Sequence, residues 1–464
     1  MATGNRIPSL LPYSRPACEI FHKVVSQPLS ARFYGGQQVK PPVLLFSEGS
    51  PTTKLSDKDL AMGLNSALAQ LGERRKVLLV PPDFSRFYSK AGPLACAAAD
   101  YYKDNLSDVL PALGTHFPMT DDQLERMYPT VPRDRIRPHR WREDVVTIGE
   151  VSADFVSEAT EGVWNSPWPA QLNKLVWEGG HDLILSIGQA VPHEVIGVAN
   201  GNKNLFVGTG GEAGINESHY IGSVYGTERM MGRTDTCLRR ILNHAEDTFC
   251  EHLPIIYAQT VIEADTSGNL VTRGLFIGDR EAFEAAAELA VEVNFNHLDE
   301  ELRKVVVFMD PDEFHSTWIG NKGIYRTRMA IADGGELVIL APGVRTFGED
   351  PEIDRMIRKY GYRSSSEVID FVENNDDLRN NLGAAAHLIH GSPEGRFTVT
   401  YCPGHLTRQQ IEDVGYQYAD LETMMKRYQP TGRSEGWHTT DDGEEFYFIG
   451  NPAMGLWAAK DRLA

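Results

Sequence analysis

Short apolar runs alternate with longer amphipathic stretches along most of this chain. The runs KVLLVPP (76–82), DLILSIG (182–188) and ELVILAP (336–342) are rich in Val, Ile and Leu. The stretches DKDLAMGLNSALAQL (57–71) and REAFEAAAELAVEVN (280–294) repeat their apolar residues with the period of a helix. Strands that are apolar on both faces need a layer of helices on each side, as in parallel sheets. The alternation therefore predicts an α/β fold whose sheets are mainly parallel.

The same alternation continues through the rest of the chain. Further strands are expected at PPVLLF (41–46), VLPALG (109–114), NLFVG (204–208), KVVVFM (304–309) and RFTVTY (396–401). Further helices are expected at GPLACAAADYYKDNL (92–106), PAQLNKLVWEG (169–179), PEIDRMIRKYG (351–361) and LETMMKRYQ (421–429). One segment differs, because PIIYAQTVIEADTSGNLVTRGLFIGD (254–279) has two strand-like runs around DTSGN. This arrangement is typical of a β-hairpin.

The length of 464 residues is more than one hydrophobic core usually serves. A second series of strands and helices follows the hairpin, which places a domain boundary near 283–295. We expect an N-terminal cofactor-binding and catalytic α/β domain over 1–285 and a C-terminal α/β domain over 286–430 that closes over the substrate. The segment 431–464, which begins within the polar linker YQPTGRSEGW (428–437), is expected to pack back on the first domain. The active site is expected in the cleft between the two α/β domains.

The charge of the chain limits the partners that it can bind. The net charge is 45 − 64 = −19. Such an acidic surface argues against nucleic acid or an anionic membrane as a partner. An anionic small molecule would have to be attracted by Arg and Lys side chains placed within the site.

Cysteine usage and the termini indicate a cytoplasmic protein. The five cysteines form an odd set without a CxxC pair, which argues against a disulfide framework and fits a reducing compartment. They are Cys18, Cys96, Cys237, Cys250 and Cys402. The first residues lack a basic segment followed by an apolar run of signal-peptide length, and no run of about 18 apolar residues occurs. We therefore expect a protein that neither is secreted nor spans a membrane.

Three polar side chains follow the expected strand at 76–82. Asp83, Ser85 and Arg86 stand in LVPPDFSRFYS, at the carboxyl end of that strand. Open α/β sheets bind ligands at this edge, and an Asp and an Arg three positions apart could hold a ribose hydroxyl or a phosphate. The alternative is an ordinary helix N-cap followed by a surface arginine.

His116 follows the next expected strand, in LPALGTHFPMT. A histidine at the end of an apolar strand is well placed to act as an acid or a base near neutral pH. The alternative is a loop histidine whose ring is satisfied by the backbone.

The segment PHEVIGVANGNKNLFVGTGGEAGINESHY (192–220) brings together two histidines and a lysine, His193, His219 and Lys203. Its glycines would let the backbone approach a ligand closely. They are Gly201, Gly208, Gly210, Gly211 and Gly214. GTGGEA (208–213) also matches a relaxed dinucleotide fingerprint, but no clear βαβ unit surrounds it and the chain ahead is not strongly helical.

A basic patch stands out in the second half of this acidic chain. FHSTWIGNKGIYRTR (314–328) contains His315, Trp318, Lys322, Arg326 and Arg328. The patch either is a solvated helix face or closes over an anion from across the domain cleft. By contrast, His387 and His390 in HLIHG have the i, i+3 spacing of metal ligands without a third ligand near them in sequence, and we interpret them as one face of a helix.

These segments together resemble the nickel-pincer-nucleotide lactate racemase family, whose members racemise or epimerise 2-hydroxy acids. PPDFSR resembles the family's D-x-[ST]-R segment, and GTH resembles its first catalytic-histidine motif. PHEVIGVANGNK resembles its P-H-x-x-x-G-x-x-x-G-x-K motif, and ESHY resembles the metal-binding histidine that follows. Lys203 comes ten positions after His193, and His219 comes sixteen positions after Lys203; both spacings fit. The resemblance covers about residues 40–430.

The resemblance implies a cofactor and a role for each site residue. The cofactor is a pyridinium-3,5-bisthiocarboxylic acid mononucleotide that carries nickel (Ni). Lys203 would form a covalent thioamide with the cofactor, and His219 would be the protein ligand to nickel. His116 and His193 would be the acid/base pair, with Lys322 and Arg86 as further catalytic residues. Residues expected beside the cofactor or the substrate carboxylate are Asp83, Ser85, Arg86, Gly201 and Trp318.

The implied chemistry accounts for these residue types. Removing the hydrogen on carbon 2 as a hydride, while a base takes the hydroxyl proton, avoids a carbanion, and the cofactor carries that hydride. Two enantiomers present their hydroxyls to opposite sides, so two histidines that titrate near neutrality are needed. Nickel accepts imidazole and sulfur ligands, and arginine suits a planar carboxylate.

The chain departs from the family pattern on the substrate side. Ile319 stands where the family has a Gln three positions before Lys322, and no Trp lies between 318 and 437. Glu194 and Val195 replace an aromatic pair after His193, and Asn202 replaces a basic residue. The loss of aromatic bulk, and an extra carboxylate for hydroxyls, favour a longer polyhydroxylated substrate such as an aldonic acid. Lactate is an alternative, and so is malate, with Arg326 or Arg328 binding a second carboxylate.

Other functions stay open at this point. They are a nicotinamide-dependent 2-hydroxy-acid dehydrogenase, a zinc metallohydrolase that uses the same histidines, and a metabolite-binding protein that has lost catalysis. The resemblance further implies cofactor-maturation enzymes as partners, since separate enzymes make this cofactor. The sequence leaves open whether the protein is a monomer or a homo-oligomer.

Overall fold

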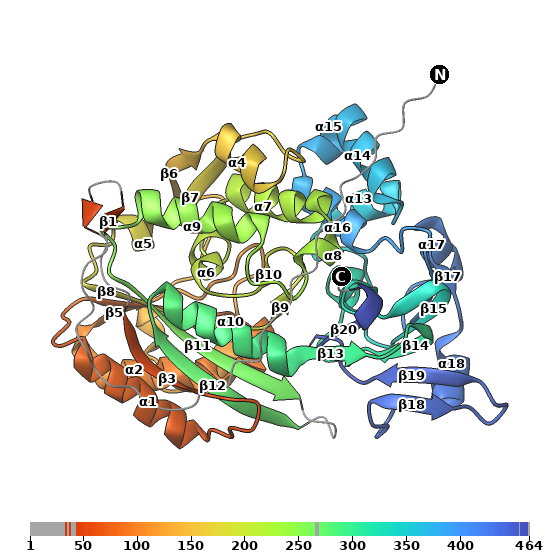
Figure 1. Ribbon diagram of the computed structural model, residues 1–464, viewed down its shortest axis with the longest axis horizontal. Coiled ribbons are helices and arrows are strands. Elements are labelled where there is room, and N and C mark those ends of the chain that lie inside the picture. The colour runs from red at the N-terminus through yellow and green to blue at the C-terminus, as the bar shows by residue number, and fades with distance from the viewer. Residues whose placement is uncertain (1–32, 35–36, 39–42, 265–268, 454, 463–464) are drawn as a thin grey trace. The chain divides into compact units, whose positions relative to one another are not determined.

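The computed structural model describes residues 33–34, 37–38, 43–264, 269–453 and 455–462 (Figure 1). The chain divides into two compact units, Met1–Pro42 and Val43–Ala464. In the first unit, β1 (Phe33–Tyr34) pairs antiparallel with β2 (Gln37–Gln38). Cys18 and residues 265–268 of the DTSGN segment lie outside the described residues. Within the described ranges, no helix has both the length and the apolar character that a membrane crossing requires.

The second unit is built around two six-stranded sheets. The strand order of the first sheet is β3-β12-β11-β8-β4-β5. Four of these strands run parallel to one another, namely β11, β8, β4 and β5. At one edge, β12 pairs antiparallel with β11, and β3 pairs antiparallel with β12. The bounds are β3 (Leu44–Gly49), β4 (Val77–Val80), β5 (Leu106–Val109), β8 (Leu183–Gln189), β11 (Ile255–Ala264) and β12 (Leu270–Gly278). The expected hairpin is confirmed as the pair β11–β12.

Helices cover both faces of this first sheet, because its central strands are apolar on both sides (Figure 1). In β4, Val77 and Leu79 face one helix layer while Leu78 and Val80 face the other. α1 (Asp57–Gln70) and α2 (Ala91–Tyr102) form the first layer. The second layer contains α6 (Asn202–Phe206), α9 (Cys237–Phe249) and α10 (Arg280–Asn294). We call residues 43–294 the first body.

Shorter elements complete the first body. β6 (Val145–Val151) pairs antiparallel with β7 (Trp168–Asn173), and β9 (Pro192–His193) pairs antiparallel with β10 (Gly197–Val198). The remaining α-helices are α3 (Asp121–Met127), α4 (Ala153–Ala159), α5 (Lys174–Glu178), α7 (Glu212–Tyr225) and α8 (Thr227–Met230). The 3-10 helices are η1 (Phe84–Ser89), η2 (Lys103–Asn105) and η3 (Arg133–Arg135).

The second sheet has the order β17-β16-β15-β14-β19-β18. All of its strands run parallel except β18, which pairs antiparallel with β19. The bounds are β14 (Leu302–Phe308), β15 (Ile331–Ala341), β16 (Thr398–Pro403), β17 (Gln417–Tyr418), β18 (Gly436–Thr439) and β19 (Glu445–Ile449). Both sheets are thus mainly parallel, and the expected fold class is confirmed.

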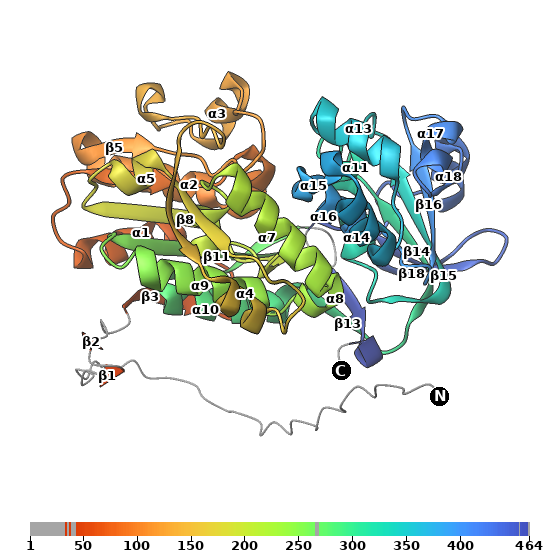
Figure 2. The same ribbon diagram turned by 90° about the horizontal axis from the view of Figure 1, so that it is seen from above.

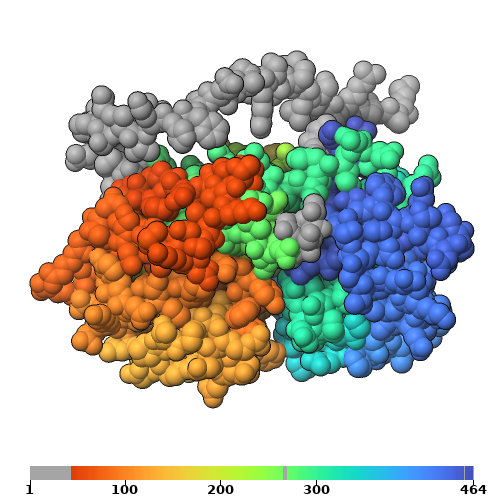
Figure 3. All heavy atoms as spheres, turned by 90° about the horizontal axis from the view of Figure 1, so that it is seen from below, coloured from red at the N-terminus to blue at the C-terminus, as the bar shows by residue number. Residues whose placement is uncertain are grey.

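Helices also cover both faces of the second sheet. One apolar layer includes α13 (Pro351–Tyr360), α14 (Ser365–Asn374) and α16 (Leu382–His390), and the other includes α18 (Leu421–Tyr428). The other helices here are α11 (Thr317–Gly320), α12 (Lys322–Tyr325), α15 (Asp376–Arg379), α17 (Arg408–Asp413) and the 3-10 helix η4 (Lys460–Arg462). We call residues 295–462 the second body. Figure 3 shows a furrow on one face where orange segments of the first body meet teal segments of the second.

Two details of the expected domain division are wrong. The boundary at 285/286 falls inside α10, which packs on the first sheet through Phe283 and Ala286. The segment 431–464 does not fold back as a whole on the first domain, because β18 and β19 extend the second sheet. Phe446 and Phe448 alternate into the core of that sheet. Only further on does β20 (Leu456–Ala459) pair with β13 (Phe295–Leu298), with Leu456 in the same apolar cluster as Met231 of the first body.

Several expected elements change type or position. NLFVG (204–208) is not a strand, since Asn202–Phe206 forms α6 with Leu205 and Phe206 in the core. PAQLNKLVWEG (169–179) is divided between strand β7 and helix α5. The strand expected at 109–114 is β5, which ends at Val109. The other expected strands and helices form within a few residues of their predicted positions.

Candidate active site

The residues singled out from the sequence in the first body follow the carboxyl ends of its parallel strands. η1, which carries Ser85 and Arg86, follows β4; His116 follows β5; and His193 follows β8. The chains after β4 and β5 stay paired, because the Ala112 N–H donates to the Pro81 carbonyl. Neighbouring parallel strands end at the same edge of a sheet, so these side chains converge there.

Asp83 and His116 form a hydrogen-bonded pair. His116 Nδ1 lies 2.7 Å from Asp83 Oδ2, and the Ser85 hydroxyl donates to Asp83 Oδ1 at 2.5 Å. Asp83 occupies the N-cap position of η1, but its carboxylate makes no capping hydrogen bond. The interpretations of Asp83 as an ordinary cap, and of His116 as a backbone-satisfied loop residue, are therefore wrong.

This pair shifts the pKa of both partners. Burial alone would lower the pKa of His116, but the charge and the hydrogen bond of Asp83 raise it above its ordinary value. Burial alone would raise the pKa of Asp83, but His116 and Ser85 lower it. The charges near His116 also include Glu349 and Lys322 of the second body, so both bodies contribute to its surroundings.

His193 has the opposite surroundings. Its side chain is buried, and its Nδ1 accepts a hydrogen bond from the Val195 N–H at 3.1 Å. Burial lowers the pKa of His193 well below its ordinary value, and nearby cations lower it further although Glu194 opposes them. These cations are Lys203, Arg86 and Arg326. The environment thus raises the pKa of one histidine and lowers that of the other, a pattern that separates an acid from a base.

A strained glycine turn positions Lys203 at the start of α6. Gly201 has φ 60° and ψ −140°, and a Cβ on it would lie 2.8 Å from the Phe283 ring, so only glycine fits. The buried Arg239 stacks on Phe283 and donates to the carbonyls of Val198 and Asn200. The side chain of Arg239 therefore holds the turn that carries Lys203.

Lys203 has a side chain suited to covalent chemistry. Burial and the charge of Arg86 lower the pKa of its amine to about 8, with Glu194 opposing them. Among the described residues, none forms a hydrogen bond or an ion pair with Lys203 Nζ. A half-buried amine with such a pKa is partly neutral near physiological pH and is therefore nucleophilic.

His219 lies on α7 with one ring nitrogen engaged. Its Nδ1 donates to the Ile215 carbonyl at 2.7 Å, which leaves the lone pair on Nε2. A histidine oriented in this way by a backbone carbonyl is suited to bind a metal through Nε2. Burial lowers the pKa of His219, and the charges around it include Lys203 and His116.

No group of three His, Cys, Asp or Glu side chains that could hold a metal occurs in the described part of the chain. A protein-only zinc site needs three or four such ligands, so the zinc metallohydrolase alternative has no ligand set among these residues.

The second body adds side chains from the segment after β14. Burial and Arg86 lower the pKa of Lys322 to about 8, while Glu313 opposes them. Arg326 is fully buried, donates to the Gly455 carbonyl and lies near Glu194. Trp318 packs on His387, with 4.4 Å between ring centroids. The cofactor role expected for Trp318 stays a prediction.

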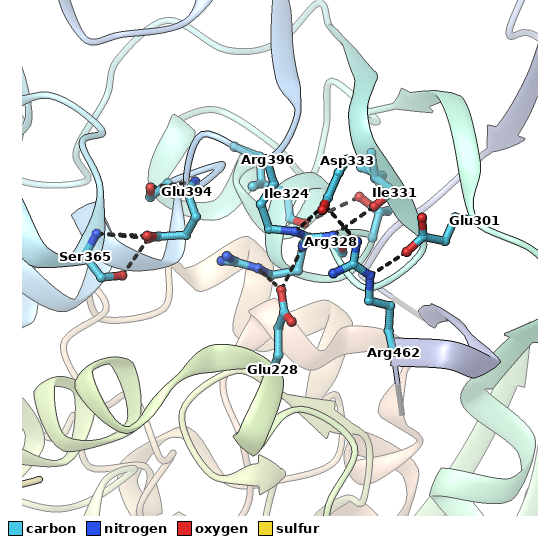
Figure 4. Close-up of polar contacts among 12 residues, drawn as sticks. Glu228, Glu301, Ile324, Arg328, Ile331, Asp333, Ser365, Glu394, Arg396 and Arg462 are labelled. Atoms are coloured by element: carbon cyan, nitrogen blue, oxygen red, sulfur yellow. Dashed lines mark hydrogen bonds and ion pairs between the residues drawn. The ribbon is translucent and has the colours of Figure 1, made fainter. Parts of the chain in front are cut away.

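Arg328 is engaged in an ion network that joins the two bodies (Figure 4). Glu228 of α8 accepts from Arg328 Nε at 3.1 Å and from Arg396 Nη1 at 3.0 Å. Arg396 and Arg462 both pair with Asp333, and Arg462 also pairs with Glu301. Arg328 is buried and already pairs with the half-buried Glu228, which removes it as a candidate for a second substrate carboxylate.

His387 and His390 lie on α16, as expected for a helix face. α16 packs against α7, so this face is buried rather than solvated (Figure 1, Figure 2). His390 Nε2 has no partner among the described residues, and its electrostatic neighbours include Glu194 and His219. The contact between the two bodies brings His390 beside the site, so its local sequence could not indicate this position. His315 was singled out as well, and no described contact connects it to the other site residues.

The glycine-rich segment lacks the context of a dinucleotide-binding motif. GTGGEA (208–213) follows helix α6, whereas the fingerprint requires a strand before it. The chain after it forms α7, so the expectation that this part is not strongly helical is wrong.

Comparisons with known proteins give matches among solved structures alone. No protein-family model matches the chain, and no curated protein matches it. A Thermotoga maritima protein solved by structural genomics is 25% identical, covers 89% of this chain and 100% of its own, and gives a TM-score of 0.76. The lactate racemase apoprotein from Thermoanaerobacterium thermosaccharolyticum is 16% identical, covers 89% of this chain and 94% of its own, and gives a TM-score of 0.66. The chain has the α/β fold of a lactate racemase. In this fold, the Asp83–His116 pair and the glycine turn that carries Lys203 lie at the carboxyl edge of the first sheet.

Proposed function

We propose that the protein is a racemase or epimerase that inverts carbon 2 of a 2-hydroxy acid and works with a nickel-pincer nucleotide. The observation that carries this proposal is the opposite perturbation of two histidines around one nucleophilic lysine. His116 is held toward the protonated form by Asp83, and His193 is held toward the neutral form. The charges that act on Lys203 include Asp83, which holds His116, and Glu194, which lies beside His193. The lactate racemase fold supports the same reaction class.

The side chains present fit such a cofactor. Lys203, with its pKa near 8 and an Nζ that no described residue engages, would form the covalent link. His219 would bind nickel through Nε2, because Nδ1 is held by the Ile215 carbonyl. The nucleotide part would lie near Asp83, Ser85, Arg86, Gly201 and Trp318. When bound, the cofactor supplies a reversible acceptor for the hydrogen on carbon 2.

The protein residues would bind the substrate and move the hydroxyl proton. Arg86 and Lys322 would hold the carboxylate, since each carries a positive charge close to the two histidines. One enantiomer presents its hydroxyl to His116 and the other to His193, so each histidine acts as base in one direction and as acid in the other. Burial of His193 excludes water, which would otherwise exchange the protons in transit.

A longer polyhydroxylated acid, such as an aldonic acid, is the substrate that the site residues favour. The Glu194 side chain is 17% exposed and offers a carboxylate to substrate hydroxyls. Lactate and malate are the alternatives of the same mechanism. For malate, Arg326 would have to bind the second carboxylate, because Arg328 is already paired with Glu228.

The test uses protein produced together with cofactor-maturation enzymes and loaded with nickel. In heavy water, lactate, malate, gluconate and other aldonates are offered, and NMR follows the configuration and the deuterium content of carbon 2. Inversion with the original hydrogen retained is the expected result for at least one acid. Inversion with deuterium gained at carbon 2 would refute hydride return, and a Lys203→Ala variant that keeps full activity would refute the cofactor link. A nicotinamide-dependent dehydrogenase would instead convert the acid to a keto acid only with added dinucleotide.

A further inference from the structure

Two groups with opposite requirements meet at Nδ1 of His193. The Val195 N–H donates to Nδ1 at 3.1 Å, and Glu194 Oε2 lies 3.6 Å from the same atom. The first group needs Nδ1 to carry a lone pair. The second group is a carboxylate that makes no hydrogen bond to Nδ1 at this distance and could accept one from it only if Nδ1 carried a proton.

The position of this proton decides what His193 can do. A neutral imidazole carries one proton, so a ring whose Nδ1 accepts from Val195 has its proton on Nε2. Such a ring can donate from Nε2 but cannot take up a proton there. A ring with the proton on Nδ1 has a free lone pair on Nε2 and can act as a base. The Val195 N–H cannot accept that Nδ1 proton, whereas Glu194 can.

We propose that Glu194 is the positioning residue of His193, accepting its Nδ1–H whenever His193 works as the base. This inference rests on the proposed function, because that function assigns the base role to His193. The protons balance: the substrate hydroxyl gives its proton to Nε2, the Nδ1 proton stays on the ring, and Glu194 stays ionised. Each catalytic histidine would then have its own carboxylate at Nδ1, since Asp83 holds His116 at 2.7 Å.

The surroundings of Glu194 keep it in the ionised form that this role needs. Burial alone would favour the neutral carboxyl, but charge interactions with His193, Arg326 and His390 lower its pKa below the ordinary value. Of these three groups, Arg326 carries its charge at neutral pH, since burial lowers the pKa of both histidines. Tyr325 lies near Glu194 as well. Among the described residues, the largest charge effects on His193 come from three cations, Lys203, Arg86 and Arg326, and from one anion, Glu194.

The arrangement belongs to this chain rather than to the resemblance on which the proposed function draws. An aromatic pair would be expected after the first histidine of that motif, and Glu194 and Val195 stand there instead. An aromatic ring at position 194 could not accept the Nδ1 proton. The carboxylate at this position therefore changes how the neighbouring histidine is held.

The first test needs no cofactor and uses the full chain with ¹⁵N-labelled histidine. Two-bond ¹H–¹⁵N correlations, assigned with a His193→Gln variant, report which ring nitrogen carries the proton. Wild type should show a fraction of His193 with its proton on Nδ1, beside the Nε2–H form that the Val195 contact requires. In Glu194→Gln this fraction should be lost and the acid dissociation constant of His193 should rise at least tenfold, whereas Glu194→Asp should retain the fraction in part. The control is Glu313→Gln, which removes a carboxylate that acts on Lys322 and Arg326, and it should leave the tautomer of His193 unchanged.

The second test uses the loaded enzyme. Loss of the group that sets a histidine tautomer reduces kcat about 10⁴-fold in a serine-protease triad. In Glu194→Gln we expect a fall of up to about 10⁴-fold for the direction in which His193 is the base, with KM rising by a smaller factor because the carboxylate also faces substrate hydroxyls. The acid limb of the kcat profile should move to lower pH, because the variant lowers the pKa of His193. A merely structural role would move neither the limb nor the tautomer.

The two proposals fail in different ways. An unchanged tautomer and an unchanged pH profile in a folded Glu194→Gln protein would overturn the role of Glu194. A rise in KM with the tautomer and kcat unchanged would also overturn it, and would leave Glu194 as a substrate contact alone. If wild-type protein inverts no 2-hydroxy acid while Glu194→Gln still moves the proton of His193, the proposed function fails and the Glu194–His193 pair stands.

Discussion

The pair formed by Asp83 and His116 gives a prediction whose size follows from the structure. Asp83→Asn keeps the shape of the side chain and removes its charge. A hydrogen bond to a charged group contributes about 1.5–3 kcal/mol. Because 39% of the His116 side chain is exposed, solvent screens the pair and the lower end of this range applies. A change of about 1.5 kcal/mol corresponds to about one pKa unit. We therefore expect the pKa of His116 to fall by about one unit in the variant.

The assay is an NMR titration of His116, assigned by a His116→Gln variant, in protein without cofactor. Ser85→Ala is the matched control, because it removes a hydroxyl donor to Asp83 but keeps the carboxylate beside His116. This control should move the pKa of His116 much less than Asp83→Asn does. Equal pKa values for His116 in wild type and Asp83→Asn would refute the assignment of Asp83 as the group that holds its charge.

The same pair predicts how the stability difference depends on pH. The folded pKa of Asp83 is lowered, so its contribution is present above the unfolded value of about 3.9 and is lost as the pH falls through the lower folded value. The folded pKa of His116 is raised, so its contribution is complete below the unfolded value of about 6.5 and is lost as the pH rises through the higher folded value. Wild type should therefore exceed Asp83→Asn in free energy of unfolding most strongly between about pH 4 and pH 6.5, as measured by urea denaturation.

Three further predictions concern other parts of the site. At pH 8, Lys203 should react with an amine reagent faster than exposed lysines because its pKa is about 8, which peptide mass spectrometry would measure; equal rates would contradict this. In protein loaded with cofactor, His219→Ala should lose nickel as measured by metal analysis, whereas His390→Ala should retain it. Glu228→Gln leaves Arg328 unpaired and should lower the free energy of unfolding by about 1–3 kcal/mol, less than for a fully buried pair because Glu228 is 34% exposed; an unchanged urea midpoint would contradict this.

The long elements could be predicted from the sequence because their signals are local. The helix expected at 280–294 forms over those residues as α10, and the two runs of the hairpin become β11 and β12. The strand predicted at NLFVG is wrong because the chain turns into helix α6 at Gly201, which has a positive φ. The apolar content of a segment does not indicate such a turn. The helix predicted at PAQLNKLVWEG is wrong in its first half, where buried and half-buried residues alternate with the period of a strand. This alternation covers too few residues to be recognised in the sequence.

The site divides in the same way between local and tertiary information. The strand ends that carry Asp83, His116 and His193 could be identified from their positions after apolar runs. The hydrogen bond between Asp83 and His116 could not, because it depends on β4 and β5 being neighbours in the sheet, 33 positions apart in sequence. The engagement of Arg328 with Glu228 could not either, since it joins the two bodies.

The charges of the site run against those of the chain as a whole. The protein has a net charge of −19, yet its cationic groups gather at the carboxyl edge of the first sheet and opposite it. They are Arg86, Lys203, Lys322 and Arg326. Such a local excess of positive charge attracts an anionic acid that the rest of the surface repels. It also lowers the pKa of each histidine, and a carboxylate beside each ring opposes that effect. Asp83 outweighs it and raises the pKa of His116, whereas Glu194 opposes it at His193 without reversing it.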